Sequence, residues 1–243
     1  MKTTFRIIAM VLVAGFYSCQ KSDVSLGVSS INSDGVFSGT IVNDSNRIDS
    51  IKVYSDSLMA ISAVSLGKST VSSSGEFSLI LSNPVLHKIG TGPNGVVVSD
   101  ITAMVGNVFK LEANKGGIRT GTIKKSNFSI RNSMIAGGSE SQFMYSDRAF
   151  TIKGTEILVD TSNDYTYNFK INYNIIFKKG WNEIVLNVDS NSDNTSSKTA
   201  VETYSNAVTS DMQWRYYPYN NASSVRVKTR GVHAISRPGF LFR

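Results

Sequence analysis

Four aromatic side chains are the residues of this 243-residue chain best suited to binding a ligand. Trp214, Tyr216 and Tyr217 are clustered toward the C-terminus, and Trp181 follows a predicted turn. Exposed Trp and Tyr rings stack on sugars, because their flat faces cover apolar C–H surface while their polar atoms hydrogen-bond to hydroxyls. The structural alternative is preferred. In it, Trp214 and Tyr216 face the core, Tyr217 packs at a rim, and Trp181 covers a strand end beside Lys178.

A second candidate site consists of oxygen ligands. Asp189, Asn191 and Asp193 have the spacing of the first ligands of a calcium-binding loop. The sixth position of such a loop is normally Gly and is Asn194 here, and the twelfth is Ala200 in place of Glu. A solvated polar loop over 189–199 is therefore expected, with weak calcium binding as the alternative.

No grouping of residues in the sequence predicts catalysis. His87 and His233 are the only histidines, and neither has a second His or an acid at metal-ligand spacing. Carboxylates are sparse, and no two lie where a shared strand face would pair them for acid–base chemistry. We therefore expect no catalytic residue, no resident metal and no cofactor. A hydrolase with an unrecognised site is the remotest alternative.

The single cysteine, Cys19, has a position that suits covalent modification. One cysteine excludes an intrachain disulfide. A basic segment precedes an apolar run over 7–17, which is shorter than the ~20 residues needed to span a bilayer. This pattern predicts a signal peptide over 1–18. Ser18 and Cys19 close the run and resemble a bacterial lipobox, in which the thiol is lipidated before cleavage. Lipidation of Cys19 is expected ahead of ordinary secretion or an uncleaved anchor.

The charge of the chain is concentrated at its C-terminus. A tether rich in small residues is expected over 19–33. The formal net charge is +7, and six bases with no acids lie from Arg215 onward. Within this basic tail, the alternation over residues 225–228 (VRVK) predicts an edge strand with outward charges, a pattern that discourages edge pairing. For an exported chain nucleic acid is not an expected partner. The expected partners are a membrane, through the lipid, and a glycan or an envelope protein.

The body of the chain has the pattern of a β protein. Hydrophobic residues make up 41% of the chain and charged residues 18%, which excludes a disordered chain and a multi-spanning membrane protein. Short segments of period-2 alternation are separated by Gly, Asn, Asp and Ser clusters, as in sheets. We predict an all-β antiparallel sandwich made of two packed β domains, over 34–115 and 116–243.

The clearest predicted element is a hairpin over 164–188. Apolar and aromatic residues occupy every second position from Tyr165 to Phe177. A two-residue turn at Lys179-Gly180 would pair Tyr173 with Leu186, and it would keep the apolar residues of both strands on one face.

Several short motifs resemble those of an uncharacterised family of exported Bacteroidota lipoproteins. Besides the lipobox-like start, they are Gly39-Thr40-Ile41-Val42-Asn43, Gly75-Glu76-Phe77-Ser78-Leu79, Tyr145-Ser146-Asp147 with Thr151-Ile152-Lys153-Gly154-Thr155, and Lys178-Lys179-Gly180-Trp181-Asn182. The resemblance implies all-β architecture with a transthyretin-like N-terminal portion, and export from the cytoplasm. It supplies no catalytic residues.

These features predict a non-enzymatic, lipid-anchored protein of the cell envelope, on the periplasmic or the cell-surface leaflet of the outer membrane. The expected role is that of an accessory or interaction module. The alternative is a surface glycan-binding module that uses exposed Trp and Tyr rings.

Overall fold

The computed structural model describes residues 27, 29–43, 45–55, 64–129, 135–162 and 165–219. The predicted signal peptide, Cys19, most of the tether and the basic tail after residue 219 lie outside the described residues. Within the described part of the chain, no helix is long and apolar enough to cross a membrane.

The fold is all-β, as the alternation predicted. Its one helical element among the described residues is a 3-10 turn, η1 (Ser45–Arg47). The strands are β1 (Val36–Thr40), β2 (Ser50–Ser55), β3 (Val64–Thr70), β4 (Glu76–Ile80), β5 (His87–Lys88), β6 (Val96–Val98), β7 (Met104–Lys115), β8 (Ile118–Ser126), β9 (Ser139–Ser146), β10 (Phe150–Ser162), β11 (Tyr165–Phe177), β12 (Gly180–Asp193), β13 (Ser197–Ser205) and β14 (Gln213–Pro218).

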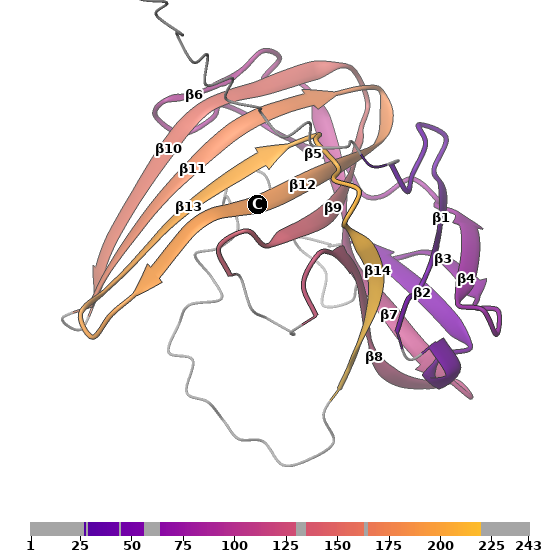
Figure 1. The fold of residues 1–243 in the computed structure, drawn as a ribbon. Coiled ribbons are helices and arrows are strands. Elements are labelled where there is room, and N and C mark those ends of the chain that lie inside the picture. The colour runs from indigo at the N-terminus through magenta and orange to yellow at the C-terminus, as the bar shows by residue number, and fades with distance from the viewer. Residues whose placement is uncertain are drawn as a thin grey trace, which may run out of the picture.

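Twelve of these strands belong to one long sheet that curves back on itself (Figure 1). Its main path runs β3-β2-β7-β8-β9-β12-β13-β11-β10-β6, with β14 added to β8 and β5 added to β7. All pairings in it are antiparallel except that of β11 with β13. The pair β1–β4 forms a second, two-stranded sheet that packs beside β2 and β3. Antiparallel and mixed sheets are thus packed together.

Two hydrophobic clusters fill the spaces between these layers. One lies under β10–β13 and includes Ile152, Phe169 and Tyr204. The other lies between the β1–β4 pair and the β2–β7–β8 part of the large sheet, and includes Phe37 and Trp214. Each cluster draws residues from both sides of the expected domain boundary at 115/116. That boundary falls in the turn between β7 and β8, which pair with each other.

The predicted hairpin over 164–188 is wrong in its pairing, although both strands exist. β13 lies between β11 and β12: it runs parallel to β11 and antiparallel to β12. Tyr173 and Leu186 are both buried in the same cluster, but each pairs with Tyr204 of the inserted strand. The other edge of β12 is occupied by β9. Side-chain alternation is the same whether two strands pair directly or through a third, so it could not distinguish the two arrangements.

Candidate functional site

All four aromatic residues that were candidates for ligand binding are buried. Trp181 and Trp214 are 4% exposed, and Tyr216 and Tyr217 are 3% exposed. Trp214 stacks on Phe143 with ring centroids 5.6 Å apart. The flat faces of all four candidate rings therefore lie inside the protein and form no surface platform for a sugar. The preferred structural interpretation holds for Trp214 and Tyr216, which face the core.

Tyr217 and Trp181 are held more deeply than expected. The hydroxyl of Tyr217 donates a hydrogen bond to the carbonyl of Phe128 at 2.7 Å, so this ring is an interior residue and does not lie at a rim. Trp181 meets Tyr145 edge to face at 5.6 Å. Trp181 is buried because β12 is covered on both faces from Gly180 to Leu186, where the two hydrophobic clusters meet it from opposite sides.

The calcium candidate lies on a strand: the segment 189–199 is solvated as expected, but the expected loop is wrong except at 194–196. β12 continues to Asp193, β13 begins at Ser197, and Asp189 and Asn191 belong to the paired strand or its bulge. Along an extended strand Asp189 and Asp193 start about 13 Å apart, which is too far for oxygens of both side chains to lie about 2.3–2.6 Å from one calcium ion. Asp189 instead accepts a hydrogen bond from the Thr203 hydroxyl at 2.6 Å. In the described ranges no group of three or more His, Cys, Asp or Glu side chains could hold a metal ion.

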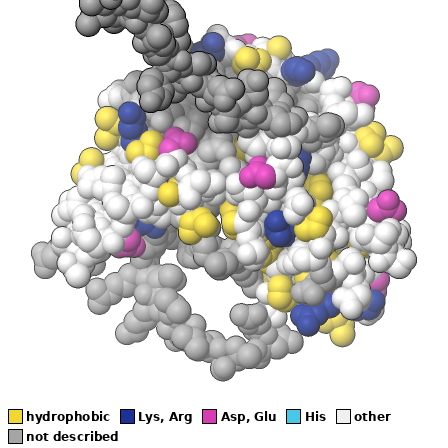
Figure 2. Space-filling model, in the orientation of Figure 1, with side chains coloured by type: hydrophobic (Ala, Val, Ile, Leu, Met, Phe, Trp, Pro, Cys, Tyr) yellow, Lys and Arg dark blue, Asp and Glu magenta, His cyan; other side chains and the backbone are white. Residues whose placement is uncertain are grey.

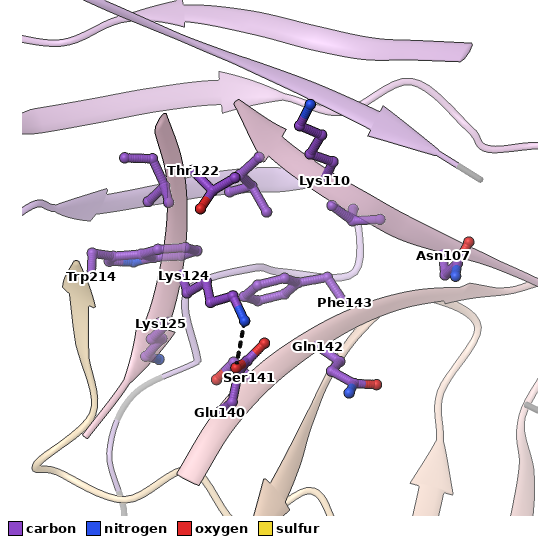
Figure 3. Close-up of a pocket in the computed structure, with 13 residues that line it drawn as sticks. Asn107, Lys110, Thr122, Lys124, Lys125, Glu140, Ser141, Gln142, Phe143 and Trp214 are labelled. Atoms are coloured by element: carbon purple, nitrogen blue, oxygen red, sulfur yellow. Dashed lines mark hydrogen bonds and ion pairs between the residues drawn. The ribbon is translucent and has the colours of Figure 1, made fainter. Parts of the chain in front are cut away.

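A small cavity opens where three strands of the large sheet separate (Figure 3). β7 pairs with β8 only from Glu112 onward, and β7 pairs with β9 only before Val108. β8 and β9 pair only at Ser126 and Glu140. The middle parts of the three strands therefore enclose a triangular gap, whose volume is about 130 Å³.

The cavity has an apolar floor and a charged mouth. Phe143 and Trp214 form part of the floor (Figure 3). At the mouth, the Lys124 ammonium lies 2.9 Å from the Glu140 carboxylate, and Lys110 pairs with Glu112 at 3.0 Å. Small-molecule pockets usually measure about 300–1,000 Å³, so this cavity has room for a few waters or a small polar group. Its lysines are neutralised by neighbouring carboxylates, which leaves no net charge to attract an anion.

A buried ion pair lies beside the cavity and joins distant parts of the chain. Lys125 of β8 meets Glu183 of β12 at 2.9 Å, and their side chains are 6% and 1% exposed. Glu183 also accepts hydrogen bonds from the Ser141 hydroxyl and, on its other oxygen, from the Ser30 backbone N–H and the Ser29 hydroxyl. A buried carboxylate needs such partners, because an unpaired buried charge is strongly destabilising. Glu183 thus fastens the segment before β1 to the large sheet.

Two further carboxylates are buried under β10–β13. Glu156 of β10 and Glu202 of β13 lie in one row across Ile171 of β11, and are 8% and 3% exposed. Tyr173 donates a hydrogen bond to Glu156 at 2.7 Å. Burial, and then this hydrogen bond, raise the pKa of the Tyr173 hydroxyl. Sequence analysis does not predict this row, because the row depends on the pairing of β11 with both β10 and β13, which side-chain alternation does not specify.

Glu202 differs from Glu156 in having a buried carboxylate oxygen that no described residue satisfies. Its Oε2 atom is buried and has no hydrogen-bond partner among the described residues. Burial raises the pKa of this carboxyl from its ordinary 4.5 to about 7. Lys198 acts in the opposite direction and Asp189 in the same direction. Glu156 and Glu202 are too little exposed for a substrate to reach them. Glu202 is instead a group that can bind a proton inside the fold.

One signal could have found these buried charges. Lys125, Glu183 and Glu202 each occupy the apolar phase of an alternating segment, as in Trp181-x-Glu183-x-Val185. A charged residue in that phase is either a break in the strand or a buried, paired group.

Comparison with known proteins gives no relative: no protein-family model, no curated protein and no solved structure matches the chain.

Proposed function

We propose that this protein is a non-enzymatic, lipid-anchored protein of the cell envelope, whose β-sheet body is an accessory or interaction module. In this proposal residues 1–18 are a signal peptide and Cys19 carries the lipid. The outer membrane is the site of anchoring, in the periplasmic or the cell-surface leaflet. The resemblance to exported Bacteroidota lipoproteins belongs to the same proposal.

The observation that carries the proposal is the attachment of the last part of the predicted tether to the body, so the expected tether over 19–33 is wrong in its described part, residues 27 and 29–33. The Gly27 N–H donates to the Val208 carbonyl at 2.7 Å, and the Ser30 N–H donates to Glu183 at 2.7 Å. Ile31, the next residue, is 6% exposed and belongs to a hydrophobic cluster. The body therefore holds residues 27 and 29–31, which would leave a lipid on Cys19 only a few residues from a fixed point of the fold.

This attachment limits how far the body can lie from a membrane. Eight residue steps separate Cys19 from Gly27, and an extended chain covers at most about 3.6 Å per residue. A lipid on Cys19 would keep Gly27 within about 29 Å of the bilayer surface. Two or three acyl chains hold a protein stably, because each buried CH2 contributes about 0.8 kcal/mol.

The glycan-binding alternative loses the feature that suggested it. It required Trp181, Trp214 and Tyr217 on the surface, and all three are buried. A protein or lipid component of the envelope is therefore the partner class that we propose.

Metabolic labelling with an alkyne fatty acid tests the anchor directly. The wild-type chain should incorporate the label and remain in the membrane fraction after a carbonate wash. Cys19→Ala should lose both properties, and Ser22→Ala, three residues further on, should keep both. Equal labelling of wild type and Cys19→Ala would overturn the proposal.

A further inference from the structure

The outer face of β10 and β11 is the side of the curved sheet that points away from the hydrophobic cluster under these strands (Figure 1). In β10 the even-numbered residues Ile152 and Glu156 are buried, so the odd-numbered residues lie on the outer face. In β11 the odd-numbered residues are buried, so the even-numbered residues lie there. Val97, the middle residue of β6, lies on the same side, because it pairs with Lys153. We call the outward side chains of β6, β10 and β11 the outer patch.

The outer patch contains four of the six most exposed large aliphatic side chains in the described part of the chain. They are Ile157 (71% exposed), Val97 (69%), Val159 (64%) and Ile176 (55%). A single exposed aliphatic side chain is ordinary on a protein surface, but a face that gathers several of them is a candidate contact surface.

Lysines lie beside these aliphatic side chains. Val97 pairs with Lys153 between β6 and β10, and Ile157 pairs with Lys170 between β10 and β11. Paired residues of neighbouring strands have their side chains about 5 Å apart on the same face. Both lysines are exposed. On the side of the molecule shown in Figure 2, exposed hydrophobic side chains likewise lie in small groups, some of them next to Lys or Arg side chains.

The outer patch carries positive charge without acids. Besides the aliphatic residues and Lys153 and Lys170, the outward residues of β10 and β11 are all Thr or Asn. Lys178 and Lys179 are exposed directly after β11. None of these four lysines forms an ion pair with a described residue. Across the sheet, the next acid on this side is Asp189 of β12, which lies beyond β13.

This combination of side chains suits the surface of a bilayer better than the surface of another protein. Interfaces between proteins are enriched in aromatic residues and depleted of lysine, whereas the outer patch has lysines and no aromatic side chain. At a membrane surface, aliphatic side chains enter the region between headgroups and acyl chains, and lysines extend to the lipid phosphates. Basic residues near an anionic surface each strengthen binding severalfold.

The N-terminal segment reaches the body beside the outer patch. The Ile176 N–H donates a hydrogen bond to the Asn206 side chain at 2.7 Å. The Gly27 N–H donates to the Val208 carbonyl, which is two residue steps, at most about 7 Å along the chain, from Asn206. A lipid on Cys19 would therefore lie on a tether that ends next to one end of the patch.

We propose that the outer patch binds the surface of a bilayer that contains anionic phospholipids. Its four aliphatic side chains lie at the level of the headgroups, and its lysines contact lipid phosphates. The inference rests on the proposed function for the presence of a membrane, and it names the face of the body that this membrane meets. Binding by the patch does not itself need the lipid on Cys19.

Co-sedimentation with vesicles tests the charge of the patch on the full-length chain carrying Cys19→Ala. The vesicles consist of phosphatidylcholine, either alone or with about one third phosphatidylglycerol, and the chain should bind the anionic vesicles at least tenfold more tightly. Lys153→Glu combined with Lys170→Glu should weaken this binding at least tenfold. The matched control, Lys68→Glu with Lys88→Glu on β3 and β5, makes the same change in net charge at exposed positions and should weaken binding less than twofold. Residues 1–18 and the basic tail are present in every variant, so their contribution cancels in the comparison.

A fluorescent probe tests which face of the body meets the bilayer. Cys19→Ala removes the only thiol, so a polarity-sensitive dye can be attached at one introduced cysteine. Ile157→Cys lies in the patch, and the control Ile118→Cys lies on β8; the native side chains are 71% and 72% exposed. On anionic vesicles the emission of the dye at 157 should shift to the blue and be quenched by a quencher on the lipid acyl chains. The dye at 118 should show neither change.

Three outcomes would overturn the inference. The first is equal weakening by the two charge-reversed variants, because net charge and not the outer patch would then determine binding. The second is equal quenching of the dyes at 157 and 118, because the body would then have no preferred face. The third is binding to a soluble acidic polysaccharide but to neither kind of vesicle, which would assign the patch to a glycan. Failure of the wild type to incorporate the fatty-acid label would refute the lipid anchor and leave these results unchanged, because the test chain carries no lipid.

Discussion

Replacing Glu202 by Gln should remove a pH dependence from the stability of the protein. Glu202 is 3% exposed in the middle of the sheet, with one carboxylate oxygen unpartnered among the described residues. The charged or titratable groups that face it are Lys198 on its own strand, Asp189 on β12, Tyr173 on β11 and, beyond it, Glu156 on β10. Burial outweighs the attraction of Lys198, so the folded protein binds this proton more tightly than the unfolded chain does.

The sign of the effect follows from the direction of the shift. The folded-state pKa of about 7 lies above the ordinary value of 4.5, so between these pH values the native state holds a proton that the unfolded chain releases. The contribution of Glu202 to stability is therefore greatest below pH 4.5 and is lost as the pH rises through 7. A tenfold change in a proton affinity is worth 1.36 kcal/mol, so the full loss is about 3 kcal/mol.

Urea unfolding at several pH values from 5 to 8 measures this contribution. Between pH 5 and pH 8 the wild type should lose about 2.5 kcal/mol more of its unfolding free energy than Glu202→Gln loses, because the amide cannot ionise. Other titrating groups change both proteins equally and cancel in this difference. Glu76→Gln, on the exposed side of β4, should leave the wild-type pH profile unchanged. Parallel profiles for wild type and Glu202→Gln would refute the assignment of a raised pKa.

Three further substitutions test the packing described above, each measured by urea or thermal unfolding. Lys125→Met should cost about 3–5 kcal/mol because it leaves the Glu183 charge buried and unpaired; a cost below 1 kcal/mol would show that water reaches this carboxylate. Gly39→Ala should cost about 1–3 kcal/mol, since its Cβ would overlap the Trp214 ring at Nε1, and an unchanged melting temperature would contradict that packing. Trp181→Ala should cost about 3–5 kcal/mol and leave binding to a glycan array unchanged; lost glycan binding without a loss of stability would restore the alternative function.

The strands of this protein could be predicted from sequence because burial on a sheet acts at every second residue. In β11 the prediction is correct from Phe169 onward: Phe169, Ile171, Tyr173, Ile175 and Phe177 are all buried, whereas Tyr167 is only partly buried. Such a pattern depends on one strand and its two faces alone. The alternating pattern is therefore the same whichever strands lie next to it.

The neighbours themselves could not be predicted from the same pattern. β11 and β12 are joined by a two-residue turn, which normally makes a hairpin. Here Asn182 closes this turn: its side chain donates to the carbonyls of Lys178 and Gly180 and accepts the Lys178 N–H. The chain then moves away to pair with β9, and β13 fills the space that is left. Local sequence specifies the turn, but the choice of partner depends on strands more than thirty residues away.

The polar segment over 189–199 shows that amino-acid composition, like alternation, is a limited predictor of strand pairing. Its Ser, Asn, Asp and Thr residues indicate a loop, because no side chain in it gains by burial. Yet the backbone ladder of β12 and β13 continues through it, with Asp193 opposite Lys198. Asn194 makes the turn between them by accepting the N–H groups of Ser196 and Ser197 at 3.0 and 2.7 Å, as Asn does in tight turns. Two strands already aligned by their buried parts extend their ladder at little further entropic cost, so a polar end can remain a strand. A prediction based on side chains alone misses this polar end of the strands, because the stabilising groups belong to the backbone.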